Sequence, residues 1–368
     1  MSQPSTSETR TVPTRVGTKH TNIDPRSDVQ IANGRTFSKQ AGALYTLPTD
    51  AKEHNRLDYQ HEMIRLLLDD SICPNPDLVN KTLSADANPT PNIIDIGTGS
   101  GVWAIEMARK FPHANVLGCD IVLPEHPGES VPSNCRFEFL NLNKDMEKIK
   151  DMFDVVHWQL VEPATFDSDQ FFYDVARILR PGGVFIAVAA NPRLLDETGT
   201  VIPLKRAGDP KYSHFQHLMK GAYDYQFAEG PPRMIHGLWN QVFGSNPNFK
   251  DFRMQEFLIP TGPWEEEMTD KRRKIAEIMN ENIRHVVPSI AAGLRVHSKL
   301  PPDEINRLEE GSLKEFRELP PSAHAYSKWV FATTVRTDSA WSARTQRWKA
   351  PEWFGPADHI IPPLSEDS

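Results

Sequence analysis

Residues 92–101, which read N-I-I-D-I-G-T-G-S-G, decide the fold of this chain. Residues 92–96 are mostly apolar with one carboxylate, as expected of a short buried strand. Three glycines at alternate positions then predict a tight turn, and residues 102–108 predict the first two turns of a helix. A strand, a glycine loop and a helix in this order place a ligand over the helix N-terminus. Because glycine has no Cβ, backbone and ligand can approach closely at this loop.

The spacing of the glycines narrows the class of ligand. The loop reads G-x-G-x-G from Gly97 to Gly101, and Asp95 stands two residues before the first glycine. A dinucleotide pyrophosphate loop has the spacing G-x-G-x-x-G, so this pattern favours a loop that holds a nucleoside. An ordinary glycine-rich turn is the alternative, since short glycine motifs also occur without a ligand.

Composition excludes several classes of protein. The chain has 368 residues, enough for one large domain or two small ones, and 39% of them are hydrophobic, enough for a substantial core. Its net charge of −8 argues against broad electrostatic binding of nucleic acid. Cys73, Cys119 and Cys135 have no metal-ligand spacing and suit a reducing compartment. Because the sequence has no run of about 18 apolar residues and no apolar leader segment, neither a membrane helix nor secretion is expected.

Two further strands follow the glycine loop, and each ends at a polar residue. Residues 115–120 predict the second strand, which ends at Asp120, 19 positions past Gly101. In a doubly wound sheet this position lies beside the ribose of a bound nucleoside, where a carboxylate can accept two hydrogen bonds; a turn aspartate is the alternative. Residues 135–140 predict the third strand, and the amide of Asn141 after it can serve the edge of the base.

The fourth predicted strand, residues 153–158, carries the candidate catalytic residue. His157 lies near its C-terminal end, and Gln159 and Glu162 follow it. Ligands of open α/β sheets bind at that edge, so these side chains should face the reacting part of the ligand. Imidazole is the usual general base near neutral pH, which makes His157 the candidate. The alternatives are a purely structural role for it, or a base among the later histidines His214, His217 and His236.

The residues before the glycine loop predict a tail, a helix and a loop. Residues 1–36 are rich in Ser, Thr, Pro and Arg and predict a disordered tail. Residues 51–69 have apolar side chains at helical spacing, with Asp50 as a fitting N-cap. Arg56 lies on this helix in a polar stretch that is either a solvated face or part of a site. Residues 70–91 contain several prolines and little periodicity, and they predict a loop.

Residues 191–245 interrupt the alternation of strands and helices. They follow the fully apolar fifth strand at residues 184–189 and concentrate aromatic residues and histidines. We expect a helical lid over the ligand; a fixed helical subdomain with its own core is the alternative. The remaining pattern predicts a strand at 252–260, a helix at 269–287 with a basic run at 271–274, a helix at 302–319, a strand at 328–335 and a loose tail at 337–368 with a docked segment at 348–354.

Taken together, these segments resemble a class I S-adenosylmethionine (SAM)-dependent methyltransferase, and more narrowly the LaeA-like methyltransferases of filamentous fungi. The resemblance covers residues 35–336, and its most specific combination is R-L-D-Y-Q-H at 56–61 with D-I-G-T-G-S-G-V-W-A-I at 95–105. The other matching segments are Y-T-L-P-T-D at 45–50, L-G-C-D at 117–120, R-P-G-G at 180–183, P-T-G-P-W at 260–264 and H-A-Y at 324–326.

The resemblance implies a Rossmann-like α/β fold: a seven-stranded, mostly parallel sheet with helices on both faces, an N-terminal helical cap and a helical lid insertion. The domain would span residues 37–336, with the cap at 37–91, the SAM-binding core at 92–190, the lid and acceptor region at 191–245 and the end of the sheet at 246–336. No metal site is expected. The expected SAM-binding residues, of which Tyr45 and Arg56 close the site, are Tyr45, Arg56, Asp95, Gly97, Thr98, Gly99, Gly101, Asp120, Ile121, Asn141 and Leu142.

Three functions fit this fold and cofactor. A cytoplasmic enzyme would methylate an O or N atom of a small, largely apolar secondary metabolite, which the aromatic residues of 191–245 favour. A LaeA-type regulator would act in the nucleus through protein partners on secondary-metabolite genes, which the basic run at 271–274 favours, although a solvated helix face also explains that run. The third is a SAM-binding protein without an acceptor. We expect no membrane association and no direct binding of nucleic acid in any of the three.

Overall fold

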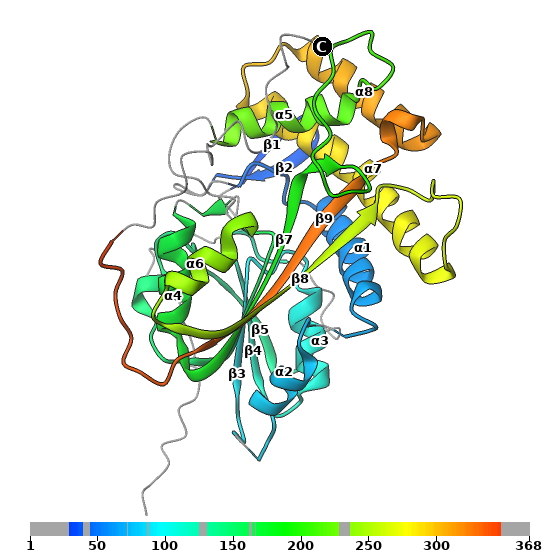
Figure 1. Cartoon of the computed structure of the whole chain (residues 1–368). Coiled ribbons are helices and arrows are strands. Elements are labelled where there is room, and N and C mark those ends of the chain that lie inside the picture. Colours follow the sequence, from blue (N-terminus) through cyan, green and yellow to red (C-terminus); the bar gives the residue numbers. More distant parts are fainter. Residues whose placement is uncertain are drawn as a thin grey trace, which may run out of the picture.

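The structure is a computed structural model, and it describes residues 29–39, 45–71, 73–86, 88–124, 131–161, 164–165, 167–227 and 236–346. Its centre is a sheet in the order β5-β4-β3-β6-β7-β9-β8 (Figure 1). The neighbours from β5 to β7 are parallel, whereas β9 runs antiparallel to both β7 and β8. The strands are β3 (Asn92–Ile96), β4 (Asn115–Asp120), β5 (Cys135–Phe139), β6 (Phe153–Gln159), β7 (Leu179–Leu195), β8 (Phe249–Pro260) and β9 (Tyr326–Arg336).

Helices cover both faces of this sheet, which confirms the predicted Rossmann-like α/β fold. Figure 1 shows α4 (Ser168–Ile178) and α6 (Trp239–Ser245) on one side, and α2 (Pro76–Thr82) and α3 (Val102–Lys110) on the other. Ile94 and Val156 belong to the core under α4 and α6, while Ile93 and Val155 belong to the core under α2 and α3. This alternation follows from the two-residue period of a strand.

A cap of four helices and a hairpin lies over one end of the sheet (Figure 1). It comprises α1 (Ala51–Leu67), α5 (His214–Phe227), α7 (Asp270–His297) and α8 (Pro302–Glu318), with the hairpin strands β1 (Val29–Ala32) and β2 (Arg35–Ser38). Helix α7 packs against α1, α5 and α8, and these helices share a third core with parts of β7, β8 and β9. None of the described helices combines the length and the apolar character needed to cross a membrane.

The N-terminal half differs from prediction in two places. The predicted disordered tail ends earlier than residue 36, because residues 29–38 form the antiparallel hairpin of β1 and β2; residues 1–28 lie outside the described part of the chain. Its turn is Asn33-Gly34, with φ of 50° and 71°, and Asn-Gly is a strong sequence signal for a hairpin. The predicted loop 70–91 contains α2, which starts with Pro76 in its first turn, where a missing amide costs nothing.

The second half differs in the length and the placement of elements. Strand β7 continues past the predicted run 184–189 as far as Leu195, and α7 continues past residue 287 through Pro288 to His297. The start of the predicted C-terminal tail is docked, because Trp341 Nε1 donates to the carbonyl of Tyr173 at 3.0 Å. The predicted docked segment 348–354 lies outside the described residues.

Candidate functional site

A cavity of about 350 Å³ opens beneath the cap, where β3, β4, β5 and β6 end. Its lining comes from the strand ends and the glycine loop, from residues 45–61 of the cap, and from β7, α5, α7 and β9. Among the predicted residues, Gly101 lies outside this lining; it is the N-cap of α3, with φ of 78°. The others all line the cavity: Tyr45, Arg56, Asp95, Gly97, Thr98, Gly99, Asp120, Ile121, Asn141, Leu142 and His157.

The glycine loop has a left-handed backbone that other residues adopt only with strain. The φ angle is 71° at Gly97 and 55° at Gly99. A Cβ at Gly97 would collide with Val161, and a Cβ at Gly99 would lie 2.6 Å from Cδ1 of Leu57 on α1. The amide of Gly97 donates to the carbonyl of Cys119 at 2.8 Å, which ties the loop to β4. The loop is therefore a fixed cradle with α1 packed against it.

Asp95 joins the glycine loop to the neighbouring strand. Its Oδ2 accepts a hydrogen bond from Thr98 Oγ1 at 2.6 Å, and its Oδ1 lies 2.7 Å from Nδ1 of His157. In a neutral imidazole this contact assigns the proton to Nδ1, which leaves Nε2 as a hydrogen-bond acceptor. The ring of His157 is 2% exposed and stacks on Trp103 with a centroid distance of 3.8 Å. Asp95 and Trp103 thus fix the orientation of this imidazole in the cavity wall.

Asp120 is held by backbone amides at the end of β4. Its Oδ2 accepts from the amide of Gly99 at 2.9 Å, and its Oδ1 accepts from those of Ile121 and Val122 at 2.7 and 3.3 Å. Burial raises the pKa of this carboxyl, although the amides oppose the rise. Because a carboxylate has about four lone-pair sites, Asp120 can still accept bonds from a ligand. Its position at the end of β4 and its remaining acceptor capacity fit a contact with a ribose hydroxyl.

Asn141 shapes the turn that follows β5. Its Oδ1 accepts from the backbone amide of Asn143 at 3.1 Å, and its backbone amide donates to Oδ2 of Asp145 at 3.0 Å. The side-chain carbonyl is therefore engaged within the turn, so the side-chain NH₂ is the group that can meet the edge of a base. Ile121 and Leu142 add apolar surface to the same lining.

Arg56 is buried between two helices of the cap. Its Nε and Nη2 donate to Oε1 of Glu53 at 2.9 and 2.6 Å, and its Nη1 donates to Oδ1 of Asn282 on α7 at 2.9 Å. Tyr45 lies close to this group, and burial, followed by the charge of Glu53, raises the pKa of its hydroxyl. Glu53 was not among the predicted site residues, although its i,i+3 spacing from Arg56 is a signal. The sequence carries no signal for Asn282, which is 226 positions away from Arg56.

The predicted lid 191–245 divides into two structures with different surroundings. Helix α5 contributes Phe215, Met219 and Tyr223 to the cavity lining. Helix α6 packs on the sheet instead, where Trp239 and Phe243 are buried in the core beneath α4. Among the described residues of 191–245, α5 and the end of β7 with Asn191, Pro192 and Leu194 line the cavity, whereas α6 does not.

The other candidate bases and polar residues lie elsewhere. His214 and His217 do not line the cavity: the ring of His217 stacks on Tyr212, and its Nε2 lies 2.8 Å from the carbonyl of Lys205. The side chain of His236 and the whole of Glu162 lie outside the described residues. Gln159 lines the cavity. His157 is thus the one predicted base that the described structure places at the cavity.

Helix α5 is anchored by a buried carboxylate of α8. Glu315 is 5% exposed, and its Oε2 accepts from the amide of Phe215 in the first turn of α5 at 3.3 Å. A carboxylate is favourable at a helix N-terminus, where amides lack partners within the helix. Burial nevertheless raises the pKa of Glu315 from its ordinary 4.5 to about 7.

This pKa predicts a pH-dependent stability that Glu315→Gln should remove. The folded protein holds the proton more tightly than the unfolded chain, so its stability should fall as the pH rises from 4.5 to about 7. The loss should approach about 3 kcal/mol. Denaturant unfolding measures this: between about pH 5 and about pH 8, the free energy of unfolding of the variant should rise by this amount relative to that of the wild type. Glu310→Gln, an exposed site on the same helix, is the control; an equal gain there would contradict the assignment.

Comparison with known proteins agrees with this geometry. A family model described as a methyltransferase domain matches residues 88–228. The protein-methionine methyltransferase laeA of Emericella nidulans is 26% identical over 279 residues, which are 74% of this chain and 67% of that protein. The methyltransferase pytC of Aspergillus terreus is 25% identical over 263 residues, 71% of this chain and 74% of that protein.

A third relative matches over a shorter region. The secondary metabolism regulator laeA of Coprinopsis cinerea is 31% identical over 151 residues, and the chain spans only 37% of its length. The matched domain at residues 88–228 contains the glycine loop, Asp120, Asn141 and His157. With the observed sheet order, these matches show a SAM-dependent methyltransferase that uses SAM as its cofactor and is similar in sequence to the laeA and pytC proteins.

Proposed function

We propose that the protein transfers the methyl group of SAM to an oxygen or nitrogen atom of a small, largely apolar secondary metabolite. The supporting observation is the part of the cavity lining that comes from β7, α5, α7 and β9, in which every side chain is uncharged. Leu194, Phe215, Ile283, Ile290 and Trp329 supply much of this surface. An apolar wall with a few polar groups is typical of sites for small organic molecules.

The cofactor would lie on the glycine loop and along the ends of β4 and β5. In this arrangement the Asp120 carboxylate holds the ribose hydroxyls, and Ile121 and Leu142 pack on the faces of the base. The side-chain NH₂ of Asn141 donates a hydrogen bond to the edge of the base. Tyr45 and Arg56 close the site from the cap. The glycine loop and Asp95 hold the rest of the cofactor at the end of β3.

Asp120→Ala should weaken SAM and S-adenosylhomocysteine alike. Loss of charged hydrogen bonds to the ribose should cost about 1.5–3 kcal/mol, which is roughly 10- to 150-fold in affinity. Calorimetric titration of both ligands measures the change. Asp174→Ala, which removes a carboxylate from α4 outside the cavity, is the control. Equal affinity of the Asp120 variant and the wild type would mean that Asp120 only shapes the turn and the ribose is held elsewhere.

The chain's own contribution to the reaction is alignment and the exclusion of water. SAM, when bound, supplies a methyl group that is already activated by a sulfonium. The apolar wall and α5 hold the acceptor against the strand ends and keep solvent away. Good alignment alone supplies roughly 7–11 kcal/mol in model reactions. A hydroxyl acceptor must also lose a proton, for which we propose Nε2 of His157.

A regulatory function is the alternative, and the names of the relatives favour it. LaeA proteins of several fungi are described as regulators of secondary metabolism, whereas pytC is described simply as a methyltransferase. A regulator would act in the nucleus through protein partners, and its acceptor would be a side chain of a protein. Fold and cofactor site are shared by both functions, so the acceptor has to distinguish them.

Deletion of the gene followed by mass spectrometry of metabolites is the test. The enzyme predicts that one compound accumulates without its methyl group, and that the purified protein methylates this compound with SAM. The regulator predicts that products of many pathways fall together and that no single demethylated compound accumulates. The second result would overturn the proposed function.

A further inference from the structure

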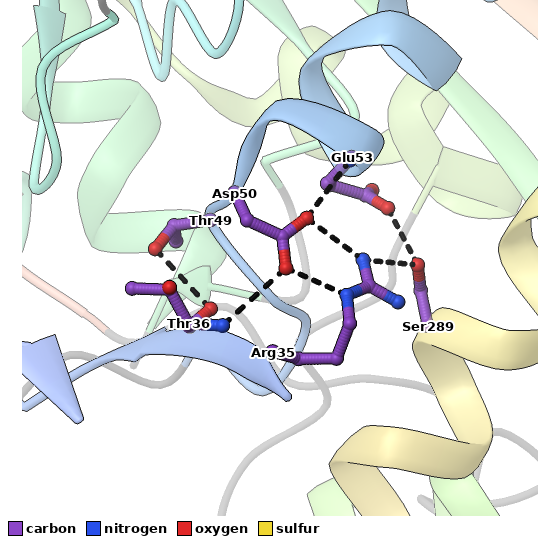
Figure 2. Close-up of polar contacts among 6 residues, drawn as sticks. All are labelled: Arg35, Thr36, Thr49, Asp50, Glu53 and Ser289. Atoms are coloured by element: carbon purple, nitrogen blue, oxygen red, sulfur yellow. Dashed lines mark hydrogen bonds and ion pairs between the residues drawn. The ribbon is translucent and has the colours of Figure 1, made fainter. Parts of the chain in front are cut away.

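Arg35 links the β1–β2 hairpin to α1 and α7 of the cap. Arg35 on β2 donates from Nε to Oδ2 of Asp50 at 2.6 Å and from Nη2 to Oδ1 of the same carboxylate at 3.0 Å (Figure 2). Its Nη2 also lies 3.3 Å from Oγ of Ser289 on α7. The amide of Thr36 donates to Asp50 as well, at 3.3 Å. The hairpin thereby bonds both to Asp50, the N-cap of α1, and to Ser289 of α7.

The same network continues to the cavity. Asp50 Oδ1 accepts from the amide of Glu53 at 3.2 Å and so starts α1 (Figure 2). Ser289 Oγ donates to Oε2 of Glu53 at 2.7 Å, while Oε1 of Glu53 accepts from Arg56. Glu53 is 1% exposed, so both of its oxygens depend on these partners. Arg35 and Arg56 are thus the two ends of one row, with the carboxylates of Asp50 and Glu53 between them.

Each charge in this row depends on its neighbours. Burial by itself would raise the pKa of Asp50, but the hydrogen bond from Arg35, the amide of Glu53 and the charge of Arg35 outweigh it and lower the pKa. Without Arg35, two carboxylates, Asp50 and Glu53, would share one remaining guanidinium. Removal of one member of a buried ion pair is costly because the other is left uncompensated. Such a change should displace Glu53, and with it the guanidinium that lies in the cavity wall.

The segment that precedes α1 is also packed closely against α7. A Cβ at Gly293 of α7 would lie 2.5 Å from the carbonyl oxygen of Thr46, so the chain crosses α7 in direct contact. Gly293 lies one helical turn after Ser289, on the same side of α7. Tyr45, beside Thr46, lines the cavity. The hairpin, this crossing and the first turn of α1 therefore contact the same side of α7.

We propose that Arg35 is a positioning residue for the cofactor site, acting through Asp50, Ser289 and Glu53 on Arg56. Arg35 does not itself line the cavity, so the hairpin tunes cofactor affinity from outside the site. This inference rests on the proposed function in one respect, namely that Arg56 contacts the cofactor.

The test is a double-mutant cycle read by calorimetric titration with S-adenosylhomocysteine. Arg35→Gln should weaken binding about tenfold, and Arg56→Lys, which keeps a positive charge beside Glu53, should weaken it at least as much. If Arg35 acts through Arg56, Arg35→Gln should add less than about twofold in the Arg56→Lys background. Ser289→Ala removes one hydrogen-bonding side chain of the row without removing a charge, so it should reduce affinity less than Arg35→Gln does. In the double variant, the loss of affinity should be smaller than the product of the two single losses. If Arg35→Gln does not fold, the Ser289→Ala cycle with Arg56→Lys replaces it.

Arg295→Gln is the matched control. Arg295 lies on the same helix as Ser289 and pairs with Glu309 of α8, so its loss tests the general effect of breaking a cap ion pair. It should lower the melting temperature without weakening binding. Fully multiplicative losses for Arg35→Gln and Arg56→Lys, or unchanged affinity for Arg35→Gln, would overturn the proposal. If the wild type binds while Arg56→Lys has no effect, the placement of Arg56 at the cofactor fails, and the inference fails with it.

Discussion

Gly99→Val should abolish SAM binding while the protein stays folded. The φ of 55° at this position is unfavourable for a β-branched residue, and the new side chain would enter the path by which a nucleoside approaches the loop. Its first atom would also meet Leu57 of α1, a flexible side chain that can move, so the cost to folding should stay near 1–3 kcal/mol. The affinity should fall by more than about 1,000-fold, since in the proposed arrangement the loop contacts the nucleoside, and the Gly99 amide donates to Asp120.

Calorimetric titration of the folded variant measures this loss, with circular dichroism as the check on folding. Gly199→Val is the control, because Gly199 has a φ of 79° and lies in a turn outside the cavity. It repeats the backbone strain without touching the site. Measurable SAM binding by Gly99→Val close to the wild-type affinity would show that the loop does not hold the nucleoside.

His157→Gln should lower the rate of methyl transfer to a hydroxyl acceptor by about 100-fold or more, the usual contribution of a general base. Glutamine can keep a hydrogen bond to Asp95 but cannot take up the acceptor's proton, so binding of S-adenosylhomocysteine should change by less than roughly threefold. The measurement is a single-turnover rate with the compound that metabolite profiling identifies, because product release can hide the chemical step in kcat.

A control for this substitution is His113→Gln, because His113 bonds to the carbonyl of Leu83 at 2.8 Å away from the cavity. It should lower neither rate nor affinity. If His157→Gln reduces only thermal stability and leaves the single-turnover rate intact, the Asp95–His157 pair is structural. In that case the acceptor needs no base from this strand.

The central sheet was predictable because its local and global signals agree. The strands at 92–96, 115–120, 135–140 and 153–158 are short runs rich in apolar residues, and the structure places them within one residue of prediction. Asp50 was predicted as an N-cap, and its carboxylate does accept from the amide of Glu53. Such agreement between neighbouring residues in the chain is what makes an element recognisable before its partners are known.

The rest could not be predicted because its determinants are distant in sequence. Helices α5 and α6 are both aromatic, and only their packing partners show that one lines the cavity and the other fills the sheet core. Strand β7 extends to Leu195 because β9 pairs again with Leu194 and Leu195 after an irregularity that contains Asn191 and Pro192, a tertiary effect that local strand propensity does not show. The ion-pair row joins residues 35 and 289 to residues 50, 53 and 56, and only the last three have a helical spacing; no periodicity connects residues 35 and 289 to them.

The position of β9 has a consequence for synthesis of the protein. This strand comes last in the sheet by sequence, yet it lies between β7 and β8 and is the sole sheet neighbour of β8. While a ribosome is still translating the residues before Tyr326, the edge of β7 that faces away from β6 has no partner, and β8 has no strand to pair with. Unpaired strand edges and uncovered apolar faces are sites at which nascent chains associate wrongly. Until Arg336 has left the exit tunnel, the sheet cannot be completed, and these two strands stay open to wrong pairing.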